Sequence, residues 1–443
     1  MFTQLRVNNF KAWQGEHRVE LAPLSLFLGT NSAGKTSLLQ MLLLLKQTAE
    51  SPDRRQHLNL GGQPGDVLHL GGFKDIVSGH DAKRVLAFGL RFTGSRPTKK
   101  GPIEIEYDVS YCQAPGGVPV VKSLMYASGD WTFKAERGPR GGYRLTTADP
   151  GPGGKVGEAG LLTARKYEPE RSVAFSAQAV AALGLDGGHV QDLALQMVEA
   201  LKQIVYLGPL REQPQRTYLW NQQNPGDLGT KGEFAIQSLV ASANDRAKPT
   251  ETGGRGWLVE RVSHWLKKLE VADGFSLEHE GSSVHYEVLV HQGKIKANLV
   301  DVGFGVSQVL PVVTLAYFVP EGSTVILEQP EIHLHPLAQT KLADLFVEVS
   351  RQRRVQFLVE THSEILFRRL QFLIADEHIS PEKCRLYFVK RGKEIAALHR
   401  LEVDEFGRIK NWPDKFFGDA IGEVERQTRR MIERLAKRRR AEA

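Results

Sequence analysis

The chain has 443 residues, of which 41% are hydrophobic and 25% are charged. These fractions are typical of a soluble globular protein, and the length predicts two or three packed units. The composition excludes a collagen-like, a largely disordered and a membrane-spanning chain. The longest apolar run, residues 38–45, is interrupted only by Gln40 and is too short to cross a bilayer, so we expect a buried helix there.

Cysteine usage and the start of the chain bear on metal sites and location. Cys112 and Cys384 have no close Cys or His partner at zinc-site spacing, so the sequence predicts neither a zinc site nor a disulfide framework. The first ten residues lack the basic start and apolar core of a signal peptide. We therefore expect a cytoplasmic protein that has no membrane segment.

The positive charge is concentrated near the end of the chain. The net charge is +7, and residues 421–443 carry eight Lys or Arg against four Glu, which amounts to +4. Closely spaced basic residues can follow the phosphate backbone of DNA. A solvated helix is an equally weighted alternative for this basic tail (residues 421–443).

Strand-type runs dominate the beginning of the chain. We expect strands at 2–10 and 24–29, and the second ends in a glycine-rich turn. An apolar helix follows at 37–47, and its hydrophobic residues lie nearly all round it, which predicts burial. Another strand is expected at 86–92. Strand, glycine-rich loop and buried helix is the order in which a phosphate-binding loop is built.

A β-rich insertion is expected at 95–180. Glycine and proline are dense there, and the alternating runs at 103–111 and 141–147 are typical of hairpin strands. A glycine-rich loop is predicted at 151–160. A plain surface loop of this length would be unusual, which favours the interpretation as an insertion.

The second half of the chain alternates helices and strands. Helices are predicted at 192–203, 257–269, 307–318, 338–351 and 363–374. Strands are predicted at 204–207, 284–290, 294–299, 324–327 and 355–359. Alternation of this kind predicts an α/β fold whose sheet is largely parallel and is covered by helices on both faces.

A phosphate-binding loop (P-loop) is indicated at residues 29–36, which match G-x-x-x-x-G-K-[ST] at every fixed position. The glycines let backbone N–H groups surround phosphate oxygens at the start of a helix. Lys35 is expected to reach the β- and γ-phosphates of ATP, and Thr36 to hold Mg²⁺. The predicted nucleotide contacts are Gly29, Thr30, Asn31, Ser32, Ala33, Gly34, Lys35, Thr36 and Ser37.

Acidic and histidine side chains follow the next buried strands. Glu328 ends the strand at 324–327, where we expect it to share the metal with Thr36. His362 follows the strand at 355–359, so it should lie at the same sheet edge as Glu328 and near the γ-phosphate or the attacking water. An ordinary buried strand and a structural histidine are the alternatives.

A second glycine-rich turn lies at 301–308 and opens a predicted helix. Its backbone N–H groups would form another anion site, for which we single out Gly303, Gly305 and Ser307. A simple tight turn between a strand and a helix is the alternative.

These motifs, in this order, resemble the ABC-type ATPase superfamily, and the SMC, RecF and OLD branch more closely than transporters. The resemblance rests on LRVNNFKAW, LFLGTNSAGKTSLL and EQPEIHLHP. The run DEFGRIKNWPDKFF resembles a C-terminal domain of unknown function found on a group of prokaryotic AAA-type ATPases, and LGPLREQPQR and GGFKDIV are similar to that group too. The match covers most of the chain and is weakest in the insertion.

The resemblance implies an ATP-bridged dimer, head to tail, in which the P-loop of one copy meets the turn at 303–307 of the other. ATP would close this dimer and hydrolysis would open it. A transporter subunit is disfavoured because the chain has VGFGVSQ where an LSGGQ-like signature would stand. About eighty residues follow His362, too few for the nuclease domain of OLD proteins, so a separate effector protein is expected.

Two positions depart from the family pattern. Gly303 stands where a serine is usual, two residues before Gly305, and Ser307 is the substitute that the sequence offers. Gln329 stands where the general-base glutamate is usual, and an amide cannot act as a carboxylate base. Either Glu331 orients the attacking water, or hydrolysis is slow and the protein remains mainly an ATP-bound dimer. We favour a slow ATPase in which Glu331 assists. His333 and His335 are expected to shape the turn.

The sequence therefore predicts a P-loop ATPase head of α/β class with a β-rich insertion and a helical C-terminal extension. The expected parts are 1–94 and 181–405 for the head, 95–180 for the insertion, and 406–443 for the extension with its basic tail. We expect an ATPase that acts as a homodimer or larger oligomer and controls a DNA-associated or phage-defence complex. The alternative is a nucleotide-dependent switch that regulates a separate effector without appreciable turnover.

Overall fold

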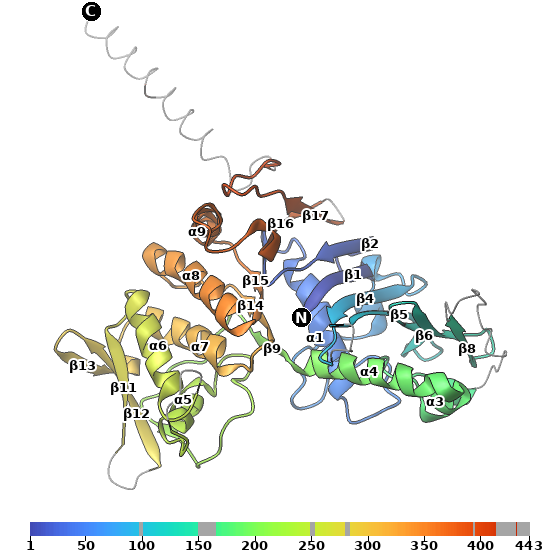
Figure 1. The fold of residues 1–443 in the computed structure, drawn as a ribbon, viewed down its shortest axis with the longest axis horizontal. Helices are drawn as coiled ribbons and strands as arrows, with labels where there is room; N and C mark the ends of the chain where they lie inside the picture. Colours follow the sequence, from blue (N-terminus) through green and yellow to red (C-terminus); the bar gives the residue numbers. More distant parts are fainter. Residues whose placement is uncertain are drawn as a thin grey trace, which may run out of the picture.

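The computed structural model describes residues 1–96, 101–148, 165–248, 253–279, 284–392, 395–412 and 431. The α-helices within these residues are α1 (Lys35–Glu50), α2 (Phe73–Ile76), α3 (Ala177–Ala182), α4 (Gly187–Lys202), α5 (Ala235–Ala243), α6 (Trp257–Lys268), α7 (Phe304–Phe318), α8 (Pro336–Arg353) and α9 (Glu364–Ala375). The described strands form three sheets, and the predicted α/β fold is confirmed (Figure 1).

The central sheet is parallel except at one edge. Its strand order is β17 (Ala396–Leu401), β16 (Cys384–Arg391), β3 (Leu24–Gly29), β15 (Gln356–Glu360), β14 (Thr324–Glu328) and β9 (Ile204–Leu207), and β17 alone runs antiparallel to its neighbour. Ile326 and Leu358 pack into the core that contains α1, while Val325 and Leu327 face the core that contains α7 and α8. The carboxyl ends of β3, β15 and β14 consequently meet at one edge, between helices on both faces.

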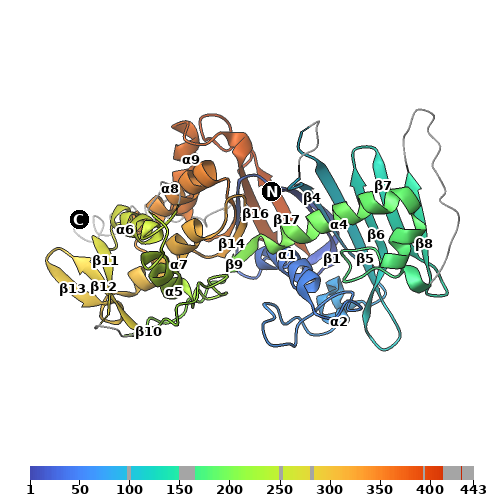
Figure 2. The same cartoon turned by 60° about the horizontal axis from the view of Figure 1, so that its bottom comes forward.

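The antiparallel sheet has the strand order β2 (Trp13–Glu20), β1 (Phe2–Phe10), β4 (Leu86–Thr93), β5 (Glu104–Gln113), β6 (Pro119–Ser128), β7 (Trp131–Arg137) and β8 (Tyr143–Ala148). The strands of the predicted insertion thus extend a sheet that begins at the N-terminus, and they share its core. Buried side chains of α1 and α4 pack with Tyr107 and Tyr126 on the inner face of this sheet. Figure 2 shows α4 running across these strands.

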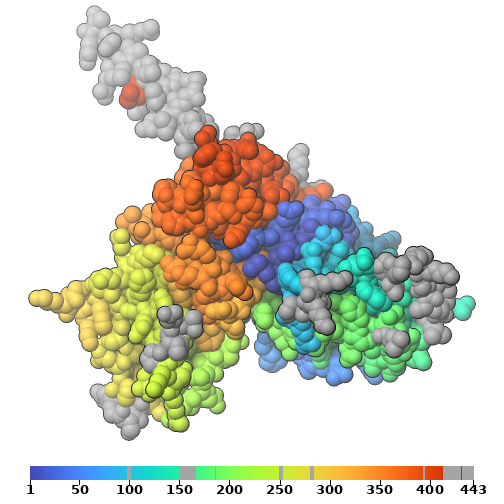
Figure 3. All heavy atoms as spheres, viewed as in Figure 1, coloured from blue at the N-terminus to red at the C-terminus, as the bar shows by residue number. Residues whose placement is uncertain are grey.

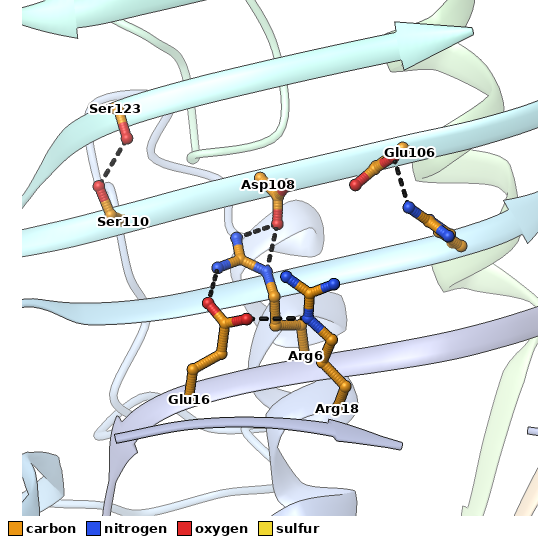
Figure 4. Close-up of polar contacts among 8 residues, drawn as sticks. Arg6, Glu16, Arg18, Glu106, Asp108, Ser110 and Ser123 are labelled. Carbon is orange, nitrogen blue, oxygen red and sulfur yellow. Dashed lines mark hydrogen bonds and ion pairs between the residues drawn. The ribbon is translucent and has the colours of Figure 1, made fainter. Parts of the chain in front are cut away.

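The outer face of the antiparallel sheet carries polar side chains that bind one another (Figure 4). Along β5, buried Tyr107 alternates with half-buried Asp108 and Ser110. Arg6 joins two strands, because its Nε donates to Asp108 Oδ1 at 2.9 Å and its Nη1 to Glu16 Oε2 at 3.1 Å. These groups satisfy one another, so this face is an outer surface and not the nucleotide site.

The third sheet belongs to a helical lobe, which we define as the described residues of 208–318. Its strands are β10 (Tyr218–Leu219), β12 (His285–Gln292), β11 (Gly274–Glu278) and β13 (Ile295–Asn298). Helices α5, α6 and α7 share its core, where Trp265 is fully buried and donates from Nε1 to Tyr317 Oη at 2.7 Å. In the space-filling view the helical lobe and the antiparallel sheet spread to opposite sides of the central strands (Figure 3).

Two sequence predictions fall outside the described residues. The glycine-rich loop at 151–160 is one of them, and the basic tail, apart from Met431, is the other. The helical C-terminal extension expected at 406–443 is described only to residue 412 and at residue 431. Among the described residues, no helix combines the length and the apolar character needed to span a bilayer.

Candidate nucleotide site

The P-loop connects β3 to α1 and depends on two glycines. Gly29 has φ 144°, and a Cβ there would lie 2.1 Å from the carbonyl oxygen of Val389 on the neighbouring strand β16. Gly34 caps α1 in the left-handed region with φ 106°. The helix then buries a nearly continuous run of leucines, which fixes its N-terminus at the edge where β3 ends.

Lys35 lies inside the loop. Its Nζ donates to the carbonyl oxygens of Gly29 and Thr30, at 3.1 and 2.9 Å, and lies 3.7 Å from Glu360 Oε1. Burial lowers the pKa of this ammonium, and the nearby carboxylate of Glu360 opposes that shift. Thr36, the next residue, donates from Oγ1 to Glu360 Oε2 at 2.7 Å. Both side chains therefore meet the same buried carboxylate.

The remaining P-loop residues divide into two groups. Thr30, Asn31 and Ser32 are exposed, whereas Ala33 and Ser37 are buried. The Ser37 hydroxyl donates to the Gly34 carbonyl oxygen at 2.8 Å, and the indole Nε1 of buried Trp13 donates to that same oxygen at 3.1 Å. The side chain of Ser37 thus holds the loop in shape and is turned away from the exposed positions.

Glu328 ends β14 directly beside Glu360, with which it is in parallel register. Only 7% of the residue is exposed, and its Oε1 accepts a hydrogen bond from Tyr206 Oη at 2.9 Å. Burial raises the pKa of Glu328 to about 7, and the nearby charge of Glu360 adds to the effect. Burial also raises the pKa of Glu360, while its bond from Thr36 opposes the shift.

Glu331 points back to the loop that follows β15. Its Oε1 accepts from Thr361 Oγ1 at 2.6 Å and from the backbone N–H of His362 at 2.8 Å. Its Oε2 is buried and has no hydrogen-bond partner among the described residues. One oxygen is therefore fixed, and the other is left with unused acceptor capacity beside the P-loop edge.

Gln329 separates the two glutamates in an unusual backbone conformation, with φ 46°. Its backbone N–H donates to the carbonyl oxygen of Glu360 at 2.8 Å. Its side chain is partly exposed and makes no hydrogen bond to the residues that the structure describes. Gln329 is thus tied to the end of β15 through its backbone, whereas Glu331 is tied through its side chain to Thr361 and His362, which follow β15.

His362 lies at the same sheet edge as Glu328, where the sequence places it. It comes two residues after β15, which pairs with the P-loop strand β3, and Lys35 disfavours its protonated form. Burial and then Lys35 lower the pKa of His362. A neutral imidazole near the P-loop lysine can both accept and donate hydrogen bonds.

The second glycine-rich turn opens α7 in the helical lobe. Gly303 caps the helix, and Phe304 is 70% exposed. A Cβ on Gly305 would lie 3.9 Å from the carbonyl oxygen of His333, so the turn lies beside the loop that follows β14. Among the described residues, no hydrogen bond or ion pair joins this turn to the P-loop of its own chain.

Ser307 does not present its hydroxyl as the sequence predicts. The residue is 6% exposed, and its Oγ donates to the carbonyl oxygen of Phe304 at 2.9 Å within the first turn of α7. In the ligand-free chain the Ser307 hydroxyl is thus engaged within α7, and its role as a substitute hydroxyl donor stays a prediction. His335 caps α8 by accepting from the backbone N–H of Leu337, as expected of a residue that shapes the turn.

Three site residues were missed by reasoning from the sequence. Glu360 lies two residues before His362 and ends the buried strand β15. A carboxylate at the end of a buried strand is a sequence signal that could have indicated a site residue. Tyr206 lies in β9, which pairs with β14, and the sequence does not reveal that pairing. Arg211 follows β9 and is 7% exposed, and none of its side-chain nitrogens has a hydrogen-bond partner among the described residues.

These residues fit ATP and Mg²⁺. Mg²⁺ in nucleotide sites uses one or two carboxylates together with phosphate oxygens, and Thr36, Glu328 and Glu360 offer such oxygens. Among the described residues, no group of three or more His, Cys, Asp or Glu side chains could hold a metal ion by itself. Within the same residues, the Arg211 nitrogens are donors without an acceptor, and Glu331 Oε2 is an acceptor without a donor.

Removing the charge of Glu328 is expected to make the ligand-free protein more stable at alkaline pH. The pKa of Glu328 is raised in the folded state. The protonated Glu328 carboxyl therefore contributes stability at low pH, and this contribution is lost as the pH rises through about 7. Glu328→Gln should match the wild type near pH 5 and exceed it at pH 8, by about 3 kcal/mol at most. Thermal melts across this range, in the presence of a chelator, measure the difference.

Glu260→Gln is the matched control, because Glu260 is exposed on α6. It should melt like the wild type at every pH. A Glu328→Gln variant that loses stability equally at pH 5 and pH 8 would contradict this account of Glu328.

Comparison with known proteins finds two family matches. Residues 205–368 match the family described as "AAA domain, putative AbiEii toxin, Type IV TA system". Residues 379–427 match "Protein of unknown function (DUF3696)". No curated protein matches the chain.

Solved structures that resemble the chain include heads of SMC proteins. The SMC head domain from Thermotoga maritima is 12% identical, with TM-score 0.41, and the match covers 91% of this chain and 99% of that one. An SMC head bound to the C-winged helix domain of ScpA is 12% identical, with TM-score 0.45 and coverage of 91% and 98%. The SMC head with an extended coiled coil, from a complex with a ScpA domain derived from Pyrococcus furiosus, is 10% identical, with TM-score 0.42 and coverage of 90% and 96%.

Proposed function

We propose that this chain, which carries an ABC-type P-loop ATPase domain, binds ATP with Mg²⁺, hydrolyses it slowly and uses the cycle to open and close a dimer. The observation that carries this proposal is the cluster at one sheet edge, where Lys35 and Thr36 of the P-loop meet Glu360, with Glu328 in register beside it. A P-loop needs such acidic neighbours to retain a metal ion.

Binding would begin with an exchange of partners at Lys35. In the ligand-free chain its Nζ is held by two P-loop carbonyl oxygens and lies near Glu360. Phosphate oxygens are stronger acceptors than neutral carbonyl oxygens, so Lys35 would turn to the β- and γ-phosphates. Thr36, Glu328 and Glu360 would then hold Mg²⁺, which neutralises charge on the phosphates when bound.

Glu331 is the residue that we assign to the attacking water. Its Oε1 is fixed by Thr361 and by the His362 backbone, and its Oε2 has no partner among the described residues. A carboxylate held in this way can orient a water and accept its proton, which Gln329 cannot do. His362, neutral and close to the P-loop, would hydrogen-bond the γ-phosphate or that water.

The dimer would be bridged by the turn at 303–307. Gly303 and Gly305 start α7, so their backbone N–H groups and the helix dipole favour an anion. Within the described residues, no hydrogen bond or ion pair ties this turn to the P-loop of its own chain. We therefore assign it to the ATP held by a second copy, in a head-to-tail homodimer or a larger oligomer.

The output of the cycle is proposed to be control of a DNA-associated or phage-defence complex through a separate effector protein. The family description over 205–368, which names a toxin–antitoxin system, supports a defence role, and the basic composition of 421–443 supports DNA binding. The alternative is a switch with negligible turnover, favoured by the specific observation that Gln329 stands at the usual position of the general base.

Steady-state ATP turnover, measured with and without double-stranded DNA, tests this function, with Lys35→Ala as the control. We expect slow turnover that DNA increases and that the control loses, because Lys35 is the P-loop cation. ATP binding without turnover in either condition would favour the switch. Turnover that persists in Lys35→Ala, or wild-type protein that binds no ATP, would contradict the proposal.

A further inference from the structure

Arg211 is a buried cation that the chain leaves without a partner. It is 7% exposed, and its Nε, Nη1 and Nη2 have no hydrogen-bond acceptor in the part of the chain that the structure describes. No carboxylate of these residues lies within 4.0 Å of its nitrogens, the limit for an ion pair. Arg353 shows the usual arrangement in this protein, because its Nη1 and Nη2 donate to the carbonyl oxygens of Ala316 and Val319.

The backbone around Arg211 is held firmly, so the side chain is not simply part of a loose loop. The segment leaves β9, and the backbone N–H of Gly208 donates to the Thr230 carbonyl oxygen at 2.8 Å. On the other side, the N–H of Glu212 donates to the carbonyl oxygen of Lys231 at 3.0 Å. These two bonds fix the chain on both sides of Arg211.

Arg211 follows the carboxyl end of β9, which runs parallel to β14 and pairs with it, so Arg211 lies near the sheet edge where Glu328 ends β14. Its charge interacts with Tyr206, Glu331 and Glu328, which also moderate the fall in its pKa that burial causes, to about 10. The guanidinium therefore remains charged at neutral pH. Glu331 acts electrostatically on Lys35 as well. The charge of Glu331 therefore acts on both Arg211 and Lys35, within one chain.

An unpaired buried guanidinium is costly, because burial removes water from five N–H donors without replacing it. This cost is offset when an anion that is not part of the chain accepts hydrogen bonds from the guanidinium. The P-loop with Lys35 lies at the same sheet edge, so the terminal phosphate of a bound nucleoside triphosphate is the anion that fits this position. A planar guanidinium can bind two of its oxygens at once.

We propose that Arg211 binds the γ-phosphate of ATP held by the P-loop of its own chain and thereby distinguishes ATP from ADP. This inference rests on the proposed function of ATP binding and adds the residue that reads the third phosphate. The segment after β9 connects the central sheet to the helical lobe. With this assignment, the same segment contacts the nucleotide directly.

The test measures the affinities of the wild type and its variants for ADP and for an imido analogue of ATP, each with Mg²⁺, by titration calorimetry. Arg211→Met should bind the analogue about tenfold to a hundredfold more weakly, the loss expected for charge-assisted hydrogen bonds, and should bind ADP as the wild type does. Arg211→Lys keeps the charge and loses the two-pronged geometry, so its affinity should fall between the two.

Arg216→Met is the matched control from the same loop. Arg216 is exposed and forms a two-pronged ion pair with Asp301, at 3.1 and 2.8 Å. This variant should retain the wild-type ratio of the two affinities. Both variants replace an arginine of this loop with methionine. A loss of affinity for the analogue that occurs only in Arg211→Met is therefore due to contact with the third phosphate and not to a general change in the loop.

The melting temperature of the ligand-free variants provides a second readout. Removing an unpaired buried charge should leave Arg211→Met at least as stable as the wild type, whereas removing a structural arginine would lower its melting temperature. An Arg211→Met protein that is less stable, or that binds the analogue and ADP with the wild-type ratio, would overturn the inference. A wild type that binds ADP and the analogue equally would overturn it too, and a wild type that binds neither would refute the proposed function itself.

Discussion

Glu331→Gln is expected to lower steady-state ATP turnover about a hundredfold or more while the protein still binds ATP. Glu331 is held by Thr361 and by the backbone of His362, and its Oε2 is the carboxylate oxygen left unpartnered beside the P-loop edge. Glutamine keeps the size and the acceptor oxygen for these bonds and removes the basicity. Turnover by phosphate release and binding by calorimetry separate the two effects.

The exposed Glu260→Gln serves as the control for this experiment and should turn over ATP like the wild type. If Glu331→Gln retained full turnover, another group would have to orient the water. If it lost ATP binding together with turnover, Glu331 would be part of the binding site and not the base.

Gln329→Glu is expected to raise turnover about tenfold or more, because it restores a carboxylate at the position where related ATPases carry the base. The backbone at this position is already fixed, with φ 46° and a bond from its N–H to the Glu360 carbonyl oxygen. The new carboxylate would adjoin Glu328 and Glu360, so some loss of stability should accompany the gain. Steady-state kinetics and a melting curve measure both.

Combining Gln329→Glu with Glu331→Gln sharpens this prediction. The double variant should retain appreciable turnover if the new glutamate acts as a base by itself. Turnover that stays at the wild-type level in Gln329→Glu would argue against the idea that Gln329 limits hydrolysis.

The sequence predicts those parts of the site that lie within one motif. The P-loop is readable because its glycines, Lys35 and Thr36 are contiguous and lie between a strand and an apolar helix. Glu328 and His362 also follow buried strands, and parallel strands bring such ends to one edge. The placement of these residues therefore follows from local pattern and from one rule of sheet topology.

Contacts between motifs could not be predicted in this way. The bond from Thr36 to Glu360 depends on β15 lying next to β3, and the contact of Tyr206 with Glu328 depends on β9 pairing with β14. Strand order depends on packing over the whole sheet, so it cannot be predicted from the local sequence of each strand. For the same reason, the β-rich segment in 95–180 gave no sign that it continues the sheet begun by β1.

Side-chain direction is a further limit. Ser307 is on the predicted helix, yet its hydroxyl bonds within the first turn of α7 instead of pointing outward. Arg211 lies in a run that resembles a family motif, but only the fold shows that its guanidinium is buried without a partner. Both facts depend on burial, and periodicity alone does not determine burial in loops and helix ends.

The central claim is that ATP is shared between two copies of this chain, and the most direct test is the solution mass of Glu331→Gln with ATP and Mg²⁺. Light scattering coupled to gel filtration should give about twice the 49.4 kDa of one chain with ATP, and a smaller species with ADP. Adding Gly305→Arg should prevent this ATP-dependent association while ATP still binds. Full ATP occupancy without any gain in mass, or association that Gly305→Arg leaves intact, would contradict the account.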